Sequence, residues 1–406
     1  MRLTLQTAFL LAFAGLAGSG SEASLKSLYD GHRWFELRDA IQGKHATPLY
    51  RGAVASAFNQ LKDAERYLNR VAAHPTSAGE ANDAHGLLAY LYGRFGRSRE
   101  VVRHFDAMLK LNPGQPGVLK ARAIYAAFSR YPDLSIGRNR HAFIPCTANA
   151  SGLTVAASAN GKTVHWYFDT GLNLGMVSES EAKMLGLEVQ DVHAEITDDA
   201  GGKTTTRASA IRSLKFGEVE LSNFPVLVIS DSQPPMNDLP PGERGAIGLP
   251  AAIAFQSFRW TAGGTFEIGS APHPNLPLRN LCFDGLNPIM RVQSEGRQLD
   301  FIFDTGNGAG TQLWERFAND FAAMVKERGV RGTQRVTQIG GANDREVFVL
   351  PELRLLVGGF DTLLRPANIF AKPVGNEFQH GLLGLDLLSR AHSVSVDFRS
   401  MSVALE

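Results

Sequence analysis

Two acidic residues stand out because each begins the same triplet in the same kind of setting. An Asp-Thr-Gly triplet occurs at residues 169–171 and again at residues 304–306. Each triplet follows a short apolar run with the β-branched and aromatic content of a buried strand, and each ends in a Gly, which permits a tight turn. The pattern therefore predicts that Asp169 and Asp304 each lie at the end of a buried strand.

Two carboxyl groups in matched settings can share one proton and perform acid–base chemistry. If Asp169 and Asp304 meet at about 3 Å, two negative charges would repel each other by about 5.5 kcal/mol at an effective dielectric constant of ~20. This repulsion corresponds to roughly four pKa units, so the pair would hold a single proton over a wide pH range. One carboxylate can then take a proton from water while its neutral partner donates a hydrogen bond to a carbonyl oxygen. No metal and no covalent intermediate is required.

An internal duplication sets the positions of the two acids. A shift of 135 residues superimposes 168–171 on 303–306 without a gap. A shift of 136 residues superimposes Gly-Ala-Ile-Gly-Leu at 245–249 on Gly-Leu-Leu-Gly-Leu at 381–385. Short apolar runs separated by Gly, Asn, Asp and Ser surround these markers, which is typical of an all-β fold with many turns.

The duplicated region is predicted to form two copies of one lobe. We place the lobes at residues 142–270 and 278–406, joined by a Pro-rich linker at 270–277. Between the Asp triplet and the later apolar marker, each copy has a Gly pair flanked by polar residues, which suits the tip of a hairpin. These predicted tips are Gly201, Gly202, Gly340 and Gly341.

With these motifs, the second part of the chain resembles the retropepsin-like aspartyl proteases of the pepsin and retropepsin clan. In that family each lobe supplies Asp-Thr/Ser-Gly after a strand, then a flap hairpin, then two apolar residues and a Gly before a short helix. All three features occur here twice and in order over residues 142–406. The resemblance implies an all-β bilobal aspartic-protease fold. It also implies an aspartic endopeptidase, without metal or cofactor, in which Asp169 and Asp304 are catalytic and activate water between them.

The resemblance also implies roles for the neighbours of the two acids. The threonines would cross-link the two acid loops beneath the pair, and the glycines would keep the backbone close to the carboxylates. These supporting residues are Thr170, Gly171, Thr305 and Gly306. Gly248 and Gly384, with their apolar neighbours, would pack under the loops. The Gly pairs would be flap tips that close over a peptide or protein substrate in an extended conformation.

The sequence departs from the family directly after each triplet. Leu172 and Asn307 stand where the family usually has Ala, Ser or Thr, and a hydroxyl at that position helps to set the proton balance of the acid. This departure leaves a second interpretation open. In it the chain is a non-catalytic scaffold, whose lobes bind a peptide without cutting it and whose first part binds a protein.

The first part of the chain has a different pattern. From about Leu25 to Arg130, Ala, Leu, Arg and Tyr recur at spacings of three and four, which predicts amphipathic helices. A shift of 34 residues aligns Ala55 with Ala89, and a period of this length resembles tetratricopeptide repeats. We therefore predict an all-α, TPR-like domain at residues 24–135, of the kind that usually offers a groove to a protein partner.

The charges are divided unequally along the chain. The net charge of the whole sequence is +1, but residues 24–141 carry +8 and the residues after them carry −7. The basic front could dock on the acidic back, shield its cleft as a regulatory segment, or attract an anionic partner such as a membrane surface. It could also be a solvated helical surface that happens to be rich in Arg.

The first residues are typical of an export signal. Arg2 precedes an apolar run that is too short to span a bilayer, and small residues follow it. We predict a signal peptide at residues 1–23, with cleavage after Ser19 or Ala23, and a periplasmic or secreted protein. No other segment reads as a membrane span, and nothing in the sequence indicates a nucleic-acid partner.

Other residues with chemical potential have simpler interpretations. Export makes a disulfide between Cys146 and Cys282 possible, but two free thiols explain the sequence as well. Neither the cysteines nor the eleven histidines have the spacing of a metal site. His165 and His380 flank family motifs and are expected to be strand and turn residues. The Gly-rich run at 306–310 lacks the glycine spacing and the Lys of a nucleotide-binding loop.

Overall fold

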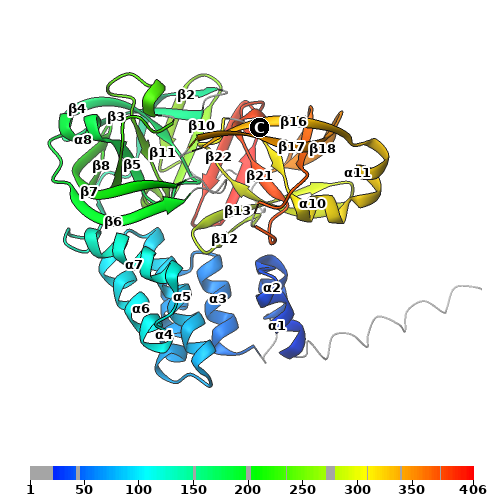
Figure 1. Ribbon diagram of the computed structural model, residues 1–406, viewed down its shortest axis with the longest axis horizontal. Coiled ribbons are helices and arrows are strands. Elements are labelled where there is room, and N and C mark those ends of the chain that lie inside the picture. Colours follow the sequence, from blue (N-terminus) through cyan, green and yellow to red (C-terminus); the bar gives the residue numbers. More distant parts are fainter. Residues whose placement is uncertain are drawn as a thin grey trace, which may run out of the picture.

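Helices form the first part of the chain and strands form most of the rest (Figure 1). The computed structural model describes residues 22–42, 46–149, 152–197, 203–234, 236–270, 279–308, 310–338, 341–374 and 376–406. The predicted order of an all-α region followed by a mostly β region with two sheets is therefore confirmed. Within these residues, no helix is both long and apolar enough to cross a membrane.

The helical region is a series of short helices in which successive members pack together. The helices are α1 (Glu22–Asp30), α2 (Trp34–Ala40), α3 (Pro48–Ala57), α4 (Leu61–Ala73), α5 (Ala78–Arg94), α6 (Ser98–Leu111) and α7 (Pro116–Phe128). Their starts follow from local chemistry: the side chains of Thr47 and Ser77 cap α3 and α5, and Pro occupies the first turn of α3 and α7. Ala55 and Ala89, which the 34-residue shift aligns, are both buried where these helices pack.

The first sheet contains the strands of the first lobe and two strands from the end of the chain. Its path runs β23-β22-β10-β11-β2-β3-β4-β9-β5-β8-β7-β6, and β1 pairs with β8. The strands are β1 (Ser135–Ile136), β2 (Ala142–Asn149), β3 (Gly152–Ala159), β4 (Lys162–Phe168), β5 (Gly175–Ser178), β6 (Gln190–Thr197), β7 (Lys203–Phe216), β8 (Val219–Ile229), β9 (Gly245–Ile247), β10 (Ser257–Thr261), β11 (Thr265–Ile268), β22 (Ser393–Asp397) and β23 (Ser402–Leu405).

The second sheet has the same kind of arrangement around β14. Its path runs β16-β17-β20-β15-β21-β14-β13-β18-β19, and β12 pairs with β13. The strands are β12 (Leu281–Asp284), β13 (Asn287–Ser294), β14 (Arg297–Phe303), β15 (Gln312–Leu313), β16 (Val330–Gln338), β17 (Gly341–Leu350), β18 (Leu353–Val357), β19 (Phe360–Leu364), β20 (Ala367–Phe370) and β21 (Gly381–Leu383). Short helices connect strands in both lobes: α8 (Glu179–Met184), η1 (Met236–Asp238), α9 (Leu249–Phe255), α10 (Glu315–Asp320), α11 (Ala322–Arg328) and α12 (Leu385–Leu388).

The end of the chain ties the two lobes together. Strand β22 pairs antiparallel with β10 of the first lobe, and Val394 lies opposite Trp260. The backbone N–H of Leu281, at the start of the second lobe, donates to the carbonyl of Met401. In Figure 1, β22 lies between the strands of the two lobes. The last strands of the predicted second lobe therefore complete the sheet of the first, so the lobes share one continuous core.

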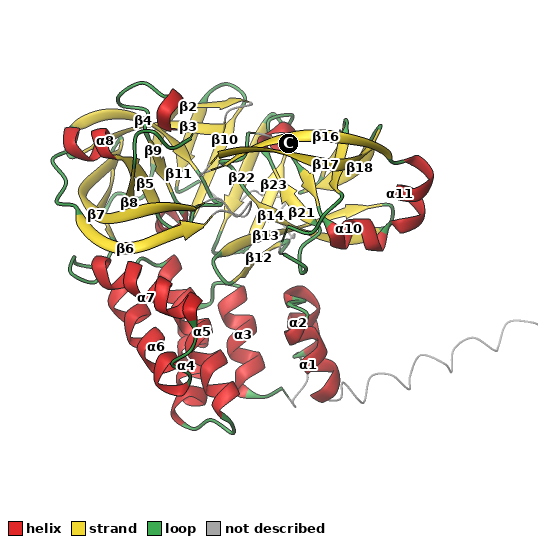
Figure 2. Cartoon of the chain, viewed as in Figure 1, coloured by secondary structure: helices red, strands yellow, loops and turns green. Residues whose placement is uncertain are grey.

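The helical region docks against both lobes, on the lower side of the strands in Figure 2. Helix α7 packs on β6 and β7 of the first lobe, and α2 and α3 contact β12 of the second. His32 stacks on Phe378 with ring centroids 3.8 Å apart. Arg94, only 1% exposed, lies 4.2 Å from the ring centroid of Phe283 and donates to the Ser56 carbonyl at 2.8 Å.

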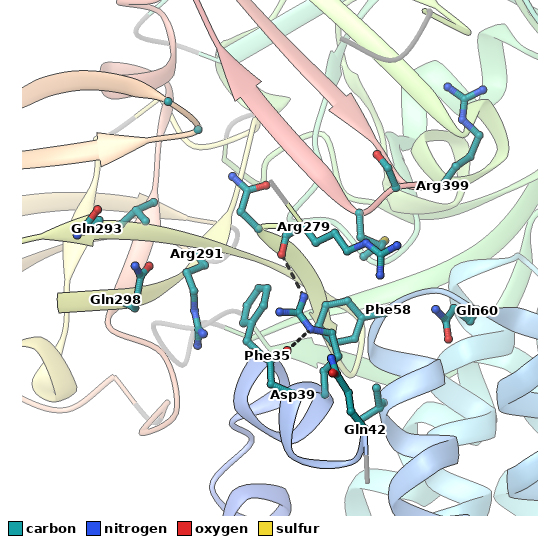
Figure 3. A pocket seen from close by; sticks show the side chains of 18 of the residues that line it. Phe35, Asp39, Gln42, Phe58, Gln60, Arg279, Arg291, Gln293, Gln298 and Arg399 are labelled. Atoms are coloured by element: carbon teal, nitrogen blue, oxygen red, sulfur yellow. Dashed lines mark hydrogen bonds and ion pairs between the residues drawn. The ribbon is translucent and has the colours of Figure 1, made fainter. Parts of the chain in front are cut away.

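A polar cavity of about 810 Å³ lies in this interface between α2, α3 and the second lobe (Figure 3). Arg38 donates to Asp39 at 2.8 Å and to the backbone carbonyl of Arg279 at 3.3 Å. Arg291 pairs with Glu36 of the helical region at 3.1 Å. The cation of this pair lies on the lobe and its anion on the helix, whereas at the His32–Asp284 contact the acid lies on the lobe.

Three expectations from the sequence concern this architecture. Cys146 and Cys282 have free thiols, and Cys282 is buried. The interpretation as two free thiols therefore holds, rather than the one as a disulfide. The hairpins β6–β7 and β16–β17 occupy the places expected for flaps. The tips Gly201, Gly202 and Gly340 lie outside the described residues, as do the predicted signal peptide up to Ser21 and most of the linker, whereas Gly341 begins β17.

Candidate active site

The two acids lie at equivalent points of the two sheets. Asp169 directly follows β4, whose last residues pair in parallel with β9, and Asp304 directly follows β14, which pairs in parallel with β21. Val164, Trp166 and Phe168 of β4 are buried in alternation, and the last five residues of β14 are all buried, so both strands end inside the lobe cores. The duplicated apolar segments at 245–249 and 381–385 therefore hold the two strands that present the acids.

The two carboxyl groups are in direct contact. A side-chain hydrogen bond joins Asp169 and Asp304. A Cβ added at Gly306 would lie 2.1 Å from Cγ of Asp169, and one added at Gly171 would lie 2.7 Å from Cγ of Asp304. Each carboxyl group thus packs against the glycine of the opposite triplet, at a distance that no other residue type allows. The structure brings together the two acids and the two glycines that the sequence singled out.

The two threonines cross-link the acid loops beneath the carboxyl pair. The Thr170 hydroxyl donates to the carbonyl of Phe303 at 2.7 Å, and the Thr305 hydroxyl donates to the carbonyl of Phe168 at 2.6 Å. Each hydroxyl also accepts the backbone N–H of the other threonine at 3.1 Å. Thr170 is 1% exposed and Thr305 is 0% exposed. This closed set of four bonds, each made across the lobe boundary, fixes the separation of the two loops.

Burial and mutual contact shift both acids in the same direction. Loss of hydration raises the pKa of Asp169, while hydrogen bonds from the Asp304 carboxyl and from backbone N–H groups act against this shift. Loss of hydration also raises the pKa of Asp304, to well above its ordinary value, and the negative charge of Asp169 raises it further. The pair therefore retains one proton, which the two acids share.

The residues after the triplets stabilise the acids through their backbone. Oδ1 of Asp169 accepts the N–H of Gly171 at 2.8 Å and the N–H of Leu172 at 3.1 Å. The Asn307 N–H likewise bonds Asp304, whereas the Asn307 side-chain amide turns away and donates to the Gly310 carbonyl at 3.0 Å. The family hydroxyl is thus replaced by main-chain donors alone, which any residue type at positions 172 and 307 provides.

The glycines of the apolar markers support the loops by close contact. A Cβ at Gly248 would lie 2.2 Å from the carbonyl oxygen of Leu174, and one at Gly384 would lie 2.9 Å from the carbonyl oxygen of Asn307. The N–H of Leu249 donates to the carbonyl of Leu172, and the N–H group one residue after Gly384 donates to that of Asn307. Both supporting glycines are therefore placed where the resemblance puts them.

Several positioning residues were missed by the sequence reasoning. Oδ1 of Asp386 accepts the N–H of Thr311 at 2.7 Å and its hydroxyl at 2.8 Å, which braces the loop after Asp304. Buried Glu181 accepts the indole N–H of Trp166 at 3.1 Å. His380 is also buried, and its Nδ1 accepts the N–H of Asp300 at 2.9 Å, so it is more than a turn residue. Of these residues only Asp386 stands inside an apolar run, and the sequence carries no comparable signal for Glu181 or His380.

A second cavity of about 810 Å³ lies between the lobes and the helical region. Asn173, from the loop after Asp169, and Ile302, from the strand before Asp304, both line it. The opposite wall comes from the helical region, with Tyr29 of α1 and Tyr90 of α5 among its residues. The described residues contain no cluster of His, Cys, Asp and Glu arranged to hold a metal ion.

Comparisons with known proteins give one family match and several structural similarities. Residues 155–250 match the family model described as aspartyl protease. An aspartic proteinase from Irpex lacteus aligns over 65% of this chain and 97% of its own, with 12% identity and a TM-score of 0.39. A retropepsin-like aspartic protease from Rickettsia conorii aligns over 34% of this chain and 95% of its own, with 15% identity and a TM-score of 0.24. No curated protein sequence matches the chain. The aspartyl protease resemblance expected from the motifs is thus confirmed over residues 155–250.

Proposed function

We propose that this chain, whose residues 155–250 carry the aspartyl protease match, is an aspartic endopeptidase that hydrolyses peptide bonds with a water activated between Asp169 and Asp304. One observation carries the proposal. The two carboxyl groups share a hydrogen bond across a lobe boundary that the two buried threonines close from below. An arrangement that keeps two buried acids in contact is costly for folding, and it provides the single shared proton that hydrolysis by an acid pair needs.

In the proposed first step one acid is a carboxylate and the other carries the shared proton, and we assign these roles to Asp169 and Asp304. The Asp169 carboxylate takes a proton from a bound water as the water oxygen bonds to the carbonyl carbon of the peptide. At the same time the proton of Asp304 passes to the carbonyl oxygen, which gives a neutral gem-diol. When the C–N bond breaks, the proton now on Asp169 passes to the amine nitrogen, and one gem-diol hydroxyl returns its proton to Asp304. The products are a carboxylic acid and an amine, and the dyad regains its initial state.

The two hairpins define how a substrate would lie. Strands β6 and β7 of the first lobe, and β16 and β17 of the second, are long antiparallel pairs that lead toward the predicted tips. A peptide in an extended conformation suits such hairpins because it offers main-chain donors and acceptors along its whole length. The substrate class we propose is therefore an extended peptide or a flexible protein segment.

The export expectation becomes part of the proposal. Helix α1 begins at Glu22, so cleavage after Ser19 would leave this helix whole, whereas cleavage after Ala23 would remove its first residues. We therefore favour a mature protein that starts at Gly20 in the periplasm or outside the cell. N-terminal sequencing of the exported protein checks this, and a protein that keeps Met1 would contradict it.

A peptide-library digest of the purified chain tests the endopeptidase proposal. We expect internal peptide bonds to be cut, and we expect a peptide with a hydroxyethylene group in place of the scissile bond to inhibit cutting, because that group occupies the position of the gem-diol. The control is the Asp361→Asn variant, which changes an exposed acid of the second lobe, the lobe that carries Asp304. Asp361 pairs with Arg354 and should be dispensable for cleavage. Absence of cleavage across a diverse library, with a folded protein, would contradict the proposal.

The scaffold interpretation is the second candidate. The observation in its favour is that Leu172 and Asn307 lack the hydroxyl found in the family, so that the dyad relies on main-chain donors alone. A scaffold would bind the hydroxyethylene peptide and the uncut parent peptide with similar affinity. A protease would bind the hydroxyethylene peptide at least about a hundredfold more tightly.

A further inference from the structure

The cavity that Asn173 and Ile302 line is built by two parts of the chain, the lobes and the helical region. The aspartyl protease match does not include the helical region. Its floor comes from the lobes, through Asn173, Ile302 and Trp314. Its other wall comes from the helical region, through Tyr29, Asp83 and Tyr90. The family match begins at residue 155, so the helical wall is a feature of this chain.

Two residues close in sequence to the catalytic acids, Ile302 and Asn173, line this cavity. On β14, Phe301 and Phe303 are both fully buried in the core of the second lobe. Successive side chains of a strand point to opposite faces, so Ile302 lies on the same face as Asp304. Asn173 is the fourth residue after Asp169, in the loop that carries this acid. A peptide with its scissile bond at the dyad would therefore place a nearby side chain in the cavity.

The helical wall is fixed to the second lobe, so the cavity is formed before a substrate arrives. Asp284 accepts hydrogen bonds from His32 at 2.7 Å and from the indole of Trp34 at 3.1 Å, and on its other oxygen from the amide of Gln379 at 2.8 Å. A Cβ added at Gly93 of α5 would lie 3.3 Å from Leu286, at the turn between β12 and β13. The helices therefore act as a fixed wall of the cleft.

The chemistry of this wall is acidic and aromatic. Asp284 is already satisfied by its three donors, and Asp30 pairs with exposed Lys26 at 2.5 Å. Asp83 instead accepts a hydrogen bond from the neutral hydroxyl of Tyr29, and burial raises the pKa of its carboxyl group. Among the described residues, no ion pair involves Asp83, and the nearest cationic influence is that of Lys26. Tyr90, 42% exposed, presents its ring to the same space.

We propose that this interdomain cavity is a specificity subsite for a basic side chain of the substrate, in which Asp83 pairs with the charge and Tyr29 and Tyr90 contact the aliphatic stem. A half-buried carboxylate beside aromatic rings favours Lys or Arg, because the charge gains an ionic hydrogen bond and the stem covers apolar surface. The helical region thereby sets which bonds are cut. This inference rests on the proposed endopeptidase function.

The test uses peptides that differ only in charge at one position. After a library digest has located a scissile bond, Lys, Arg, norleucine, Gln and Glu are placed in turn at each of the four positions on either side of it, and kcat/KM is measured. We expect one position at which Lys or Arg is preferred over norleucine by about tenfold or more. In the Asp83→Asn variant this preference for Lys or Arg over norleucine should fall to within about twofold.

The matched control is Asp63→Asn, which removes an exposed acid of α4 that pairs with Arg66 at 2.8 Å, away from the cavity. It should keep the basic preference. Tyr90→Leu is the second variant, since it changes an exposed ring and tests the wall if Asp83→Asn unfolds. A position-independent profile, or a basic preference that survives both cavity variants, would overturn the subsite.

A binding measurement separates this inference from the proposed catalysis. The full chain with Asp169→Asn is titrated with fluorescent Lys and norleucine peptides, and with the double variant Asp169→Asn/Asp83→Asn as control. Tighter binding of the Lys peptide that disappears in the double variant supports the subsite even if the wild-type chain cuts nothing. Equal binding of the two peptides by the single variant would overturn the subsite even if the wild-type chain cuts peptides.

Discussion

The threonine cross-link makes a quantitative prediction for Thr305→Val. Valine has nearly the shape of threonine but lacks the hydroxyl that donates to the Phe168 carbonyl at 2.6 Å and accepts the Thr170 N–H at 3.1 Å. Both groups lie in the buried junction and would lose these partners. Each unsatisfied buried polar group costs about 1–3 kcal/mol. We therefore expect Thr305→Val to lower the free energy of unfolding by about 2–6 kcal/mol.

The matched control for this prediction is Thr305→Ser. Serine keeps the hydroxyl and loses only a methyl group, which costs about 1 kcal/mol in a core. Urea unfolding followed by the fluorescence of the four tryptophans, all of them buried, measures the two variants against wild type. Peptide cleavage should also fall far more in the Val variant than in the Ser variant, because the loops that hold the acids would separate. A Val variant within about 1 kcal/mol of wild type, or equal effects of Val and Ser, would refute the cross-link.

Two further predictions concern the carboxyl pair. Gly306→Ala would place a Cβ 2.1 Å from Cγ of Asp169 and displace this carboxyl group, so we expect kcat to fall by on the order of a hundredfold with the fold retained. The control is Gly117→Ala, which should leave kcat unchanged because nothing lies within 4 Å of the added Cβ. Equal values of kcat for the two variants would contradict the contact between Gly306 and Asp169. The pKa of Asp304 is higher in the folded protein than in the unfolded chain, so the folded protein binds this proton more tightly. The free energy of unfolding of wild type should therefore fall as the pH rises from the pKa of Asp in the unfolded chain, about 3.9, toward the pKa of Asp304 in the folded protein. Asp304→Asn should therefore have a higher free energy of unfolding than wild type at pH 7 and lose this difference near pH 3. A variant that is equally stable or less stable than wild type at pH 7 would show that the buried Asp304 carboxyl group does not destabilise the folded protein.

Much of the site could be predicted from the sequence because the motifs are local. The turn after each acid needs a glycine, the strand before it needs a short apolar run, and both signals lie within a few positions of Asp169 and Asp304. The duplication then placed the two copies in equivalent settings. The same logic located Gly248 and Gly384, whose close contacts with the loops leave no space for a side chain.

Features that depend on distant contacts could not be predicted in this way. Strand β22 joins the first sheet although its residues belong to the second copy of the repeat, since pairing across a sheet leaves no periodic signal. Asp386 accepts the N–H of Thr311 in the loop after Asp304, and Glu181 accepts the indole N–H of Trp166 in β4. Only these contacts in the structure reveal the two acids. The docking of α7 on β6 and β7 likewise depends on surfaces that the sequence describes only as apolar.

The predicted role of Leu172 and Asn307 needed the structure for a different reason. The sequence shows which side chains are present, so it could show only that a hydroxyl was missing at these two positions. It does not show which backbone N–H groups contact the acids. The structure shows that the acids are bonded by the backbone N–H groups of these residues. The departure from the family therefore removes one possible donor for each acid but leaves its main-chain donors in place.

The central claim is that Asp169 and Asp304 act as one catalytic unit, and a single comparison tests it most directly. The rate of cleavage of one defined peptide is measured for wild type, Asp169→Asn, Asp304→Asn and the double variant, with folding checked by circular dichroism. Because each acid needs the other to share the proton, we expect each single variant to lose at least about a thousandfold in kcat and the double variant to lose no more than the singles. Cleavage at near wild-type rates in either single variant would contradict the claim.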